Sequence, residues 1–184
     1  MGKRVLLVKQ ENCKGCHLCE LACSSAKEGE FIPSHSRIWV VTNGLKGWSR
    51  PIICLQCEDP MCMAVCSAEA IHKTTTSQGD TIISIDKEKC IGCYQCIVAC
   101  PFGAIEFLKN QKATKCDLCG GSPACVEFCF YDCIKFVELS DEDYQRRLKK
   151  IKVLTTKACR ELSKQEPYKR RVMFSSDLSK VTDF

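Results

Sequence analysis

The sequence predicts an α+β fold in which one short unit recurs along the chain. The chain has 18 cysteines among 184 residues, and sixteen of them fall into four motifs of four. Apolar runs typical of strands flank these motifs, which gives the order strand, cysteine loop, short helix and second strand. The 45% hydrophobic fraction includes the cysteines. Without them the apolar content is low for a self-sufficient core, so bound groups are expected to hold the fold together.

Each motif begins with a CxxC pair and closes with a cysteine that follows the third one after three intervening residues. Motifs one and three use the spacing x2, x2, x3, whereas motifs two and four widen the middle gap and place Pro60 or Pro123 inside it. The candidate ligands are motif one (Cys13, Cys16, Cys19, Cys23), motif two (Cys54, Cys57, Cys62, Cys66), motif three (Cys90, Cys93, Cys96, Cys100) and motif four (Cys116, Cys119, Cys125, Cys129).

The segments beside the motifs predict the remaining elements. The runs VLLV before motif one and TIISI before motif three are typical of strands. Residues 71–85 predict a hairpin that turns at 77–80, where the sequence is Ser-Gln-Gly-Asp. After the closing cysteine of motifs two, three and four, a small residue stands four positions on and an Ile five positions on. This repeat predicts strands at 105–108 and 134–139, following short helices that run through the closing x3 segments.

Residues 140–184 differ from the rest of the chain. Ser140 followed by three acidic residues predicts a helix N-terminus. Apolar residues then keep helical spacing until Pro167, namely Tyr144, Leu148, Ile151, Leu154, Ala158 and Leu162. We expect this helix to pack on the preceding domain, with docking on a partner subunit as the alternative. The basic segment YKRRVMF and the polar end are expected to be extended and to order only against another surface.

The spacing of the motifs indicates iron-sulfur ligation. Three cysteines that are each separated by two residues can bring their thiolates together around one bound group. A fourth cysteine, three residues further on, lies at the start of a helix and faces away from that group. In the run CxxCxxCxxxCP, three cysteines bind one 4Fe-4S cluster and the fourth binds its partner cluster. Motif three, CIGCYQCIVACP, matches every position including Pro101, whereas Ser24, Ser67 and Phe130 replace the proline after the other motifs.

Two other uses of the cysteines are weaker. Structural zinc needs two ligand pairs separated by a spacer, and four such sites would also consume sixteen cysteines. Four cysteines within eleven residues, with apolar Ile91, Ile97 and Val98 among them, suit a large cluster in a dry shell better than one tetrahedral ion. Disulfides are rare in a reducing cytosol. The apolar run at 5–8 is too short for a signal peptide, and no run is long enough to span a membrane, so we expect a cytoplasmic protein without a membrane span.

The phrases CLQCEDPMC, CIGCYQCIVACPFGAI and TKCDLC make the sequence recognisable. It resembles the four-cluster ferredoxin-like electron-transfer subunits of multisubunit redox enzymes, such as the beta subunits of dimethyl sulfoxide reductase and formate dehydrogenase. The resemblance covers roughly residues 3–139. It implies two bacterial-type double-cluster ferredoxin units in a pseudo-twofold arrangement within residues 1–139, followed by a C-terminal helix and basic arm at 140–184.

The resemblance also implies that motif one exchanges its closing cysteine with motif four, and motif two with motif three. The implied ligand sets, each named after its first residue, are the Cys13 set (Cys13, Cys16, Cys19, Cys129), the Cys116 set (Cys116, Cys119, Cys125, Cys23), the Cys54 set (Cys54, Cys57, Cys62, Cys100) and the Cys90 set (Cys90, Cys93, Cys96, Cys66). Because all sixteen cysteines are present, four 4Fe-4S clusters are expected. One cluster per motif is the alternative.

Five further residues invite a functional interpretation. Cys133 takes the repeat position of a small residue, and we expect it to pack in the interior rather than bind iron. Cys159 lies in the predicted C-terminal helix, and packing is expected there too. His17, His35 and His72 could donate to a cluster sulfur and raise its potential. A single histidine near a loop is more often solvated, and this is the expectation for all three.

The composition and motifs favour electron transfer over catalysis or nucleic-acid binding. The net charge of +5 alone would permit a nucleic-acid partner. Each oxidised 4Fe-4S core with four thiolates carries about −2, so four would make the loaded protein acidic, and we expect no nucleic-acid partner. The sequence contains no Ser/His/Asp arrangement, phosphate loop or carboxylate pair that would transform a substrate. The chain is therefore expected to carry electrons and not to be an enzyme by itself.

The partner implied by the resemblance is a catalytic oxidoreductase subunit, with a further electron-transfer or flavin subunit beside it. Segment 28–40, EGEFIPSHSRIWV, looks similar to the same region of iron-sulfur subunits that serve tungsten or molybdenum pterin enzymes of the aldehyde oxidoreductase type, and of those that serve hydrogenase or carbon monoxide dehydrogenase. Such an enzyme of anaerobic metabolism is the favoured partner. The alternatives are the small subunit of a hydrogenase, formate or carbon monoxide dehydrogenase system, and a free-standing polyferredoxin shuttle.

Overall fold

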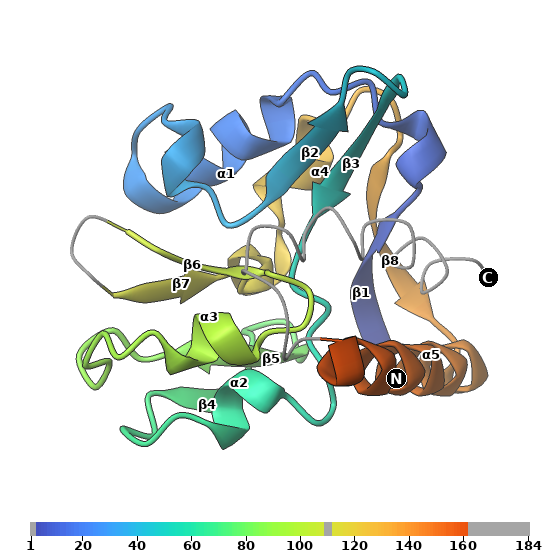
Figure 1. The fold of residues 1–184 in the computed structure, drawn as a ribbon. Coiled ribbons are helices and arrows are strands. Elements are labelled where there is room, and N and C mark those ends of the chain that lie inside the picture. The colour runs from blue at the N-terminus through green and yellow to red at the C-terminus, as the bar shows by residue number, and fades with distance from the viewer. Residues whose placement is uncertain (1–2, 109–111, 162–184) are drawn as a thin grey trace.

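A computed structural model describes residues 3–108 and 112–161 (Figure 1). The first strand, β1 (Lys3–Val8), pairs antiparallel with the last strand, β8 (Ile134–Leu139), so that Val5 lies opposite Val137. The predicted strand at 134–139 is confirmed at both ends. Pairing of the first and last strands closes the domain before the C-terminal helix begins. Short sheets and short helices alternate along the chain, which confirms the α+β class.

The other strands form three antiparallel hairpins. The predicted hairpin at 71–85 is confirmed, and Gly79 takes a φ of +88° in its turn, a conformation that side chains rarely adopt. The β2–β3 hairpin and strand β7 were not among the predicted elements. The bounds of these strands are β2 (Trp39–Asn43), β3 (Trp48–Ile52), β4 (Ile71–Thr75), β5 (Thr81–Ile85), β6 (Ile105–Phe107) and β7 (Ala113–Lys115).

A helix follows the first ligands of each motif. Helix α1 is the longest of these because helix-forming residues continue to Gly29, which ends it with a φ of +72°. The four helices are α1 (Leu18–Glu28), α2 (Met61–Ala64), α3 (Gln95–Ala99) and α4 (Ala124–Glu127). Three short 3-10 segments join them to neighbouring elements, η1 (Gln10–Asn12), η2 (Pro33–His35) and η3 (Leu118–Gly121).

The backbone repeats the same conformation in all four motifs. The residue before the second cysteine of each CxxC pair has a positive φ, and these residues are Gly15, Gln56, Gly92 and Leu118. At Gly15 a Cβ atom would lie 2.5 Å from Oγ of Ser49, so glycine avoids a close contact there in addition to suiting the positive φ. The third residue after the closing cysteine also has a positive φ in motifs two, three and four, at Glu69, Gly103 and Asp132. The predicted sequence repeat is therefore also a repeat of backbone shape.

Two separate cores contain the cysteines. One combines cysteines of motifs two and three with apolar residues from β4, β5 and β6, and the other combines cysteines of motifs one and four with residues of β1 and β8. Ile82 and Ile83 are neighbours on β5 and point into different cores, because side chains alternate along a strand. In Figure 1 the half that holds α1, α4, β2 and β3 lies above the half that holds α2, α3 and β4.

The C-terminal helix α5 (Asp141–Glu161) packs on the core of motifs two and three. Oγ of Ser140 accepts a 3.1 Å hydrogen bond from the amide of Asp143, which caps the helix as expected. The predicted apolar face is buried at Leu148, Ile151, Leu154 and Ala158. Leu162, Pro167 and the basic arm lie outside the described residues.

The expectation that Cys159 packs in the interior is wrong. Cys159 is exposed, whereas the neighbouring Ala158 is fully buried. Successive residues of a helix point about 100° apart, so a cysteine directly after a buried position leaves the apolar face. The core position in this turn of the helix belongs to Ala158.

Candidate functional site

Cysteines of motifs one and four meet around one cavity. Its lining includes Cys13, Cys16, Cys19 and Cys129, together with the additional Cys133. Burial raises the pKa of Cys19 to about 12, and the charges of Glu20, Cys13, Cys16 and Cys129 add to the shift. The closing cysteine of motif four therefore lies within electrostatic range of motif one.

A second cavity gathers cysteines of motifs two and three. Cys66, the closing residue of motif two, lines it together with Cys90, Cys93 and Cys96. Burial, followed by the charge of Cys90, raises the pKa of Cys96 to about 11. The rings of Tyr94 and Phe107, which also line this cavity, stack with centroids 4.0 Å apart and form an apolar wall.

The first three cysteines of motif two lie beside the closing cysteine of motif three. Burial is the largest cause of the raised pKa of Cys57, and the charges of Cys54, Cys100 and Cys62 raise this pKa further. Cys62 reaches a pKa of about 12 through burial and then through Cys54 and Cys100. Arg147 and Lys115 offset these shifts only in part. Metal ligation needs the thiolate form, so a bound metal must supply the remaining charge compensation.

A fourth group combines motif four with the closing cysteine of motif one. Burial raises the pKa of Cys125, and the charges of Cys116, Cys23 and Cys119 act in the same direction. Cys116 reaches a pKa of about 12 through burial and then through the charge of Cys54. Cys54 belongs to motif two, so this group borders the preceding one.

Closing cysteines accept backbone hydrogen bonds. The amide of Arg37 lies 3.3 Å from Sγ of Cys23, and the amide of Ile134 lies 3.3 Å from Sγ of Cys129. The amide of Ala104 lies 3.4 Å from Sγ of Cys100. Amide donors stabilise a thiolate, and at iron-sulfur sites they also tune the reduction potential.

Sequence reasoning missed a polar junction between the loops of motifs two and four. Nε2 of Gln56 donates to the carbonyl of Cys116 at 2.7 Å, and Oε1 of Gln56 accepts from the amide of Ile83 at 2.9 Å. The buried Lys115 donates to the carbonyls of Ile83 and Cys116 and to Oε1 of Gln56. Gln56 lies inside motif two and Lys115 directly precedes motif four. This position in the sequence is the signal that could have identified them.

A buried arginine was also missed. Arg147 is 2% exposed, and its Nη2 donates to the carbonyl of Leu55 at 3.0 Å. Arg147 follows Tyr144 by three residues and precedes Ile151 by four, so it lies on the apolar face of α5. A charged residue at such a position is the available sequence signal. Burial lowers the pKa of Arg147, whereas Tyr144, Cys57 and Cys54 oppose that shift.

Two of the three histidines have an acidic partner and so differ from the expectation of free side chains. Nδ1 of His17 lies 2.8 Å from Oε2 of the buried Glu20, and Nδ1 of His35 lies 3.3 Å from Oε2 of Glu30. Local loop geometry places an acid beside each ring, which the expectation did not consider. His72 is exposed, as expected.

Cys133 is buried at 3% exposure in the core of motifs one and four, which confirms the expected interior position. Its side chain also forms a hydrogen bond with that of Cys13. That contact places Cys133 next to the candidate ligands. Its position in the sequence differs from that of Cys129, the closing cysteine of motif four.

The donor groups of these four sites fit 4Fe-4S clusters. Thiols dominate each group, and nearby amides point at sulfur atoms. Nε of Arg147 is buried without a hydrogen-bond partner beside the cysteines of motif two, as expected where an anionic group completes the surroundings. Among the described residues, no three His, Cys, Asp or Glu side chains are placed to hold a single metal ion.

Within residues 3–108 and 112–161, no helix is both long and apolar enough to cross a membrane.

Comparison with known proteins agrees with this donor chemistry. Residues 47–139 match the family described as 4Fe-4S dicluster domain. The chain is 36% identical over 137 residues to the aliphatic sulfonate oxidoreductase polyferredoxin-like subunit of Pyrococcus furiosus, covering 72% of this chain and 76% of the relative.

Two proteins of Escherichia coli are also similar. Identity to one subunit of the anaerobic dimethyl sulfoxide reductase is 35% over 143 residues, covering 66% of this chain and 67% of the relative. Identity to the putative oxidoreductase UacF is 32% over 189 residues, and the match covers 98% of this chain but only 28% of the length of UacF. The chain therefore belongs to the 4Fe-4S dicluster family of ferredoxin-type electron-transfer proteins.

Proposed function

We propose that this chain is the electron-transfer subunit of an oxidoreductase complex and that it holds four 4Fe-4S clusters. The proposed ligands are the Cys13, Cys116, Cys54 and Cys90 sets defined above. Membership of the family supports 4Fe-4S clusters. The number four and the assignment of individual cysteines rest on the grouping of the thiols.

One observation carries this proposal. In each group, three cysteines of one motif are accompanied by the closing cysteine of another. Cys129 accompanies motif one and Cys23 accompanies motif four, whereas Cys100 accompanies motif two and Cys66 accompanies motif three. One cluster per motif would instead require each closing cysteine to lie with its own motif.

The proposed architecture has two double-cluster units related by a pseudo-twofold arrangement within residues 1–139. Its support is that one core contains motifs one and four while the other contains motifs two and three. The recurring positive φ values in all four motifs also support repeated units. The proposed second region is residues 140–184, of which the structure describes helix α5.

The protein's contribution is to hold electron carriers in sequence and to adjust their potentials. When bound, a 4Fe-4S cluster accepts and returns one electron without forming a bond to a substrate. The ligand loops fix its position, and apolar walls such as that of Tyr94 and Phe107 limit contact with water. Cys16 and Cys93 are exposed, so the Cys13 and Cys90 sets are the two that reach the surface through a ligand. We infer that electrons enter at one of these sets and leave at the other.

The favoured partner is a tungsten or molybdenum pterin enzyme of the aldehyde oxidoreductase type. Segment 28–40 supports this assignment together with the hydrogenase and carbon monoxide dehydrogenase alternatives, and two relatives are named as parts of a sulfonate oxidoreductase and of dimethyl sulfoxide reductase. The second candidate is a free-standing polyferredoxin shuttle, which the name of the Pyrococcus relative also suggests. A hydrogenase, formate or carbon monoxide dehydrogenase system is a further alternative.

Anaerobic purification of the tagged chain from its own host tests the function. Four clusters predict about sixteen iron and sixteen sulfide per chain. The subunit proposal predicts a stoichiometric partner that contains tungsten or molybdenum by elemental analysis. Nickel in the complex would identify a hydrogenase or carbon monoxide dehydrogenase system instead, and an isolated chain that reduces several enzymes would support the shuttle. About eight iron per chain would contradict four clusters.

A further inference from the structure

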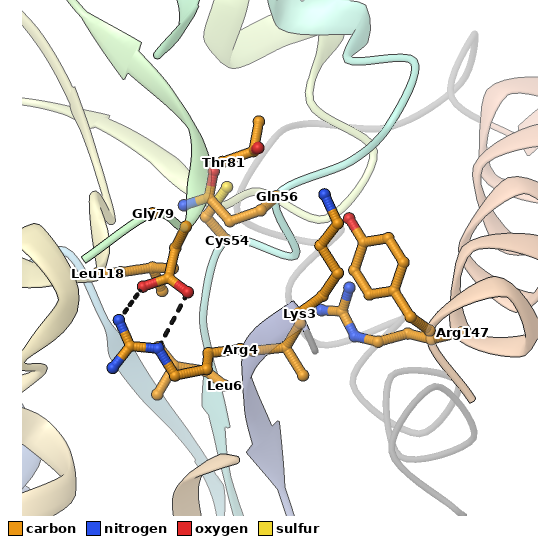
Figure 2. Close-up of a pocket in the computed structure, with 12 residues that line it drawn as sticks. Lys3, Arg4, Leu6, Cys54, Gln56, Gly79, Thr81, Leu118 and Arg147 are labelled. Atoms are coloured by element: carbon orange, nitrogen blue, oxygen red, sulfur yellow. Dashed lines mark hydrogen bonds and ion pairs between the residues drawn. The ribbon is translucent and has the colours of Figure 1, made fainter. Parts of the chain in front are cut away.

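Helix α5 brings a buried charge to a ligand loop although it lies outside the region that matches the family, residues 47–139. Arg147 reaches from α5 to the carbonyl of Leu55, which lies between Cys54 and Cys57 in the loop of motif two. Figure 2 shows Arg147 entering from α5 a pocket that Cys54 and Gln56 also line. The helix is thus anchored to the backbone of the ligand loop itself.

A second cation approaches the same cysteines from the domain interior. Lys115 is 4% exposed, and its Nζ donates to the carbonyl of Cys116 at 3.2 Å and to Oε1 of Gln56 at 3.3 Å. Gln56 belongs to the loop of motif two, whereas Cys116 opens motif four. Lys115 is therefore held between two ligand loops, while Arg147 contacts one of them.

Neither cation has a carboxylate to balance it within the described part of the chain. The acidic groups that face Lys115 are the thiols of Cys54, Cys116 and Cys62, and those that face Arg147 are Tyr144, Cys57 and Cys54. A buried charge without a counter-charge is costly. The negative charge that balances both cations must therefore come from the loaded Cys54 set, with a contribution from the Cys116 set.

We propose that Arg147 and Lys115 are positioning residues that raise the reduction potential of the cluster on the Cys54 set. The inference rests on the proposed function, because it requires a cluster on these cysteines. Reduction adds one negative charge, and a fixed positive charge in a buried, low-dielectric site favours that reduced form. Arg147 acts on the Cys54 set, whereas Lys115 also acts on the Cys116 set.

Redox titration of the loaded, full-length protein, monitored by electron paramagnetic resonance, tests the proposal. We compare the wild type with Arg147→Gln, Arg147→Lys and the control Arg146→Gln, which removes a 63% exposed side chain one residue away. Arg147→Gln should lower the equilibrium constant for reduction of one cluster about tenfold. For a one-electron couple this lowers the midpoint potential of that cluster by about 59 mV. Arg147→Lys should retain most of the potential, and Arg146→Gln should leave all midpoints unchanged.

Cys57→Ser identifies the signal, because replacing a ligand changes the spectrum of the cluster that it binds. The cluster shifted by Arg147→Gln should be the one altered by Cys57→Ser. Lys115→Gln should lower this midpoint and one other. An unchanged midpoint in Arg147→Gln, or an equal shift in Arg146→Gln, would overturn the inference.

Iron content separates failure of this inference from failure of the proposed function. About sixteen iron per chain with unchanged midpoints would reject the role of the cations and leave the four clusters intact. Fewer clusters in the wild type would reject the proposed function first. If Arg147→Gln binds less iron than the wild type, Lys115→Gln decides, since two lowered midpoints support the inference and unchanged midpoints reject it.

Discussion

Nε2 of Gln56 donates a 2.7 Å hydrogen bond to the carbonyl oxygen of Cys116, which joins two ligand loops that are 60 residues apart in the sequence. The same side chain accepts the amide of Ile83. One glutamine therefore joins its own loop to two other segments. It connects the half of the domain that contains motif two with the half that contains motif four.

Gln56→Ala should destabilise the protein by about 1–3 kcal/mol, because it leaves the Cys116 carbonyl and the Ile83 amide short of partners. For a chain of this size, each kcal/mol lowers the thermal midpoint by about 2–4 °C. Thermal unfolding under anaerobic conditions measures the effect. Gln145→Ala, at an exposed position of α5, is the control and should change stability by less than about 0.5 kcal/mol. Equal midpoints for both variants would show that the junction contributes nothing.

Cys129→Ala should damage the cluster held by motif one rather than the cluster held by motif four. The reason is that Cys129 accompanies Cys13, Cys16 and Cys19 around one cavity. Electron paramagnetic resonance should show that Cys129→Ala and Cys16→Ala perturb the same signal, while Cys119→Ala perturbs a different one. If Cys129→Ala and Cys119→Ala share their signal, each motif binds its own cluster.

Cys133→Ala should keep the full iron content, because Cys133 is a buried packing residue of the core and a neighbour of Cys13. Removing a sulfur atom from the core should lower stability by about 1 kcal/mol. Iron analysis and thermal unfolding check the two parts separately. A loss of about four iron per chain would make Cys133 a ligand.

Ile151→Ala should cost about 2–5 kcal/mol, because Ile151 is buried where α5 packs on the core of motifs two and three. Val153→Ala, on the same helix but 68% exposed, is the matched control and should have little effect. Thermal unfolding of both variants measures how strongly α5 is docked. Similar small losses would indicate that the helix does not stabilise the domain.

The ion pair between Lys27 and Asp117 should make stability depend on acid pH. Burial alone would raise the pKa of Asp117, but the 2.7 Å contact with Lys27, its charge and the amide of Cys119 lower the pKa overall. A lowered pKa stabilises the fold above the unfolded value of about 3.9 and loses this effect as the pH falls through the folded pKa. The thermal midpoint of the wild type should exceed that of Asp117→Asn at pH 7, and the difference should shrink below about pH 4. A difference that is independent of pH would assign the effect to packing.

Local patterns predicted the parts of the fold that depend on neighbouring residues. The hairpin at 71–85 and the strand at 134–139 were predicted because each has a clear apolar pattern and the hairpin has a turn that contains glycine. The β2–β3 hairpin was missed although Asn43 and Gly44 provide a turn signal between its strands. Its second strand contains Pro51, a residue that argues against a strand because it cannot donate to the hydrogen-bond ladder.

The ligand candidates could be found from spacing, whereas their surroundings could not. Cysteine spacing is a local pattern and indicates metal ligation directly. Gln56, Lys115 and Arg147 act on residues far away in the sequence, with separations of 60, 32 and 92 positions for their bonds to Cys116, Ile83 and Leu55. Such contacts depend on how the two halves of the domain meet. Of these three residues, only Arg147 could be recognised from the periodicity of the sequence, because it is a charged residue at an apolar position of a helix.

The pairing of β1 with β8 determines when the domain can close during synthesis. Residues 3–8 leave the ribosome before the rest of the described chain, and their only strand partner in the described structure is residues 134–139. At about 5–20 residues per second, β1 waits about 6 to 25 seconds for β8 to be translated. The hairpin of β4 and β5 needs no such delay, since its strands are made within one short segment. The local hairpins can therefore form before β1 and β8 pair, and residues 3–8 are among the last of the described residues to find their partner.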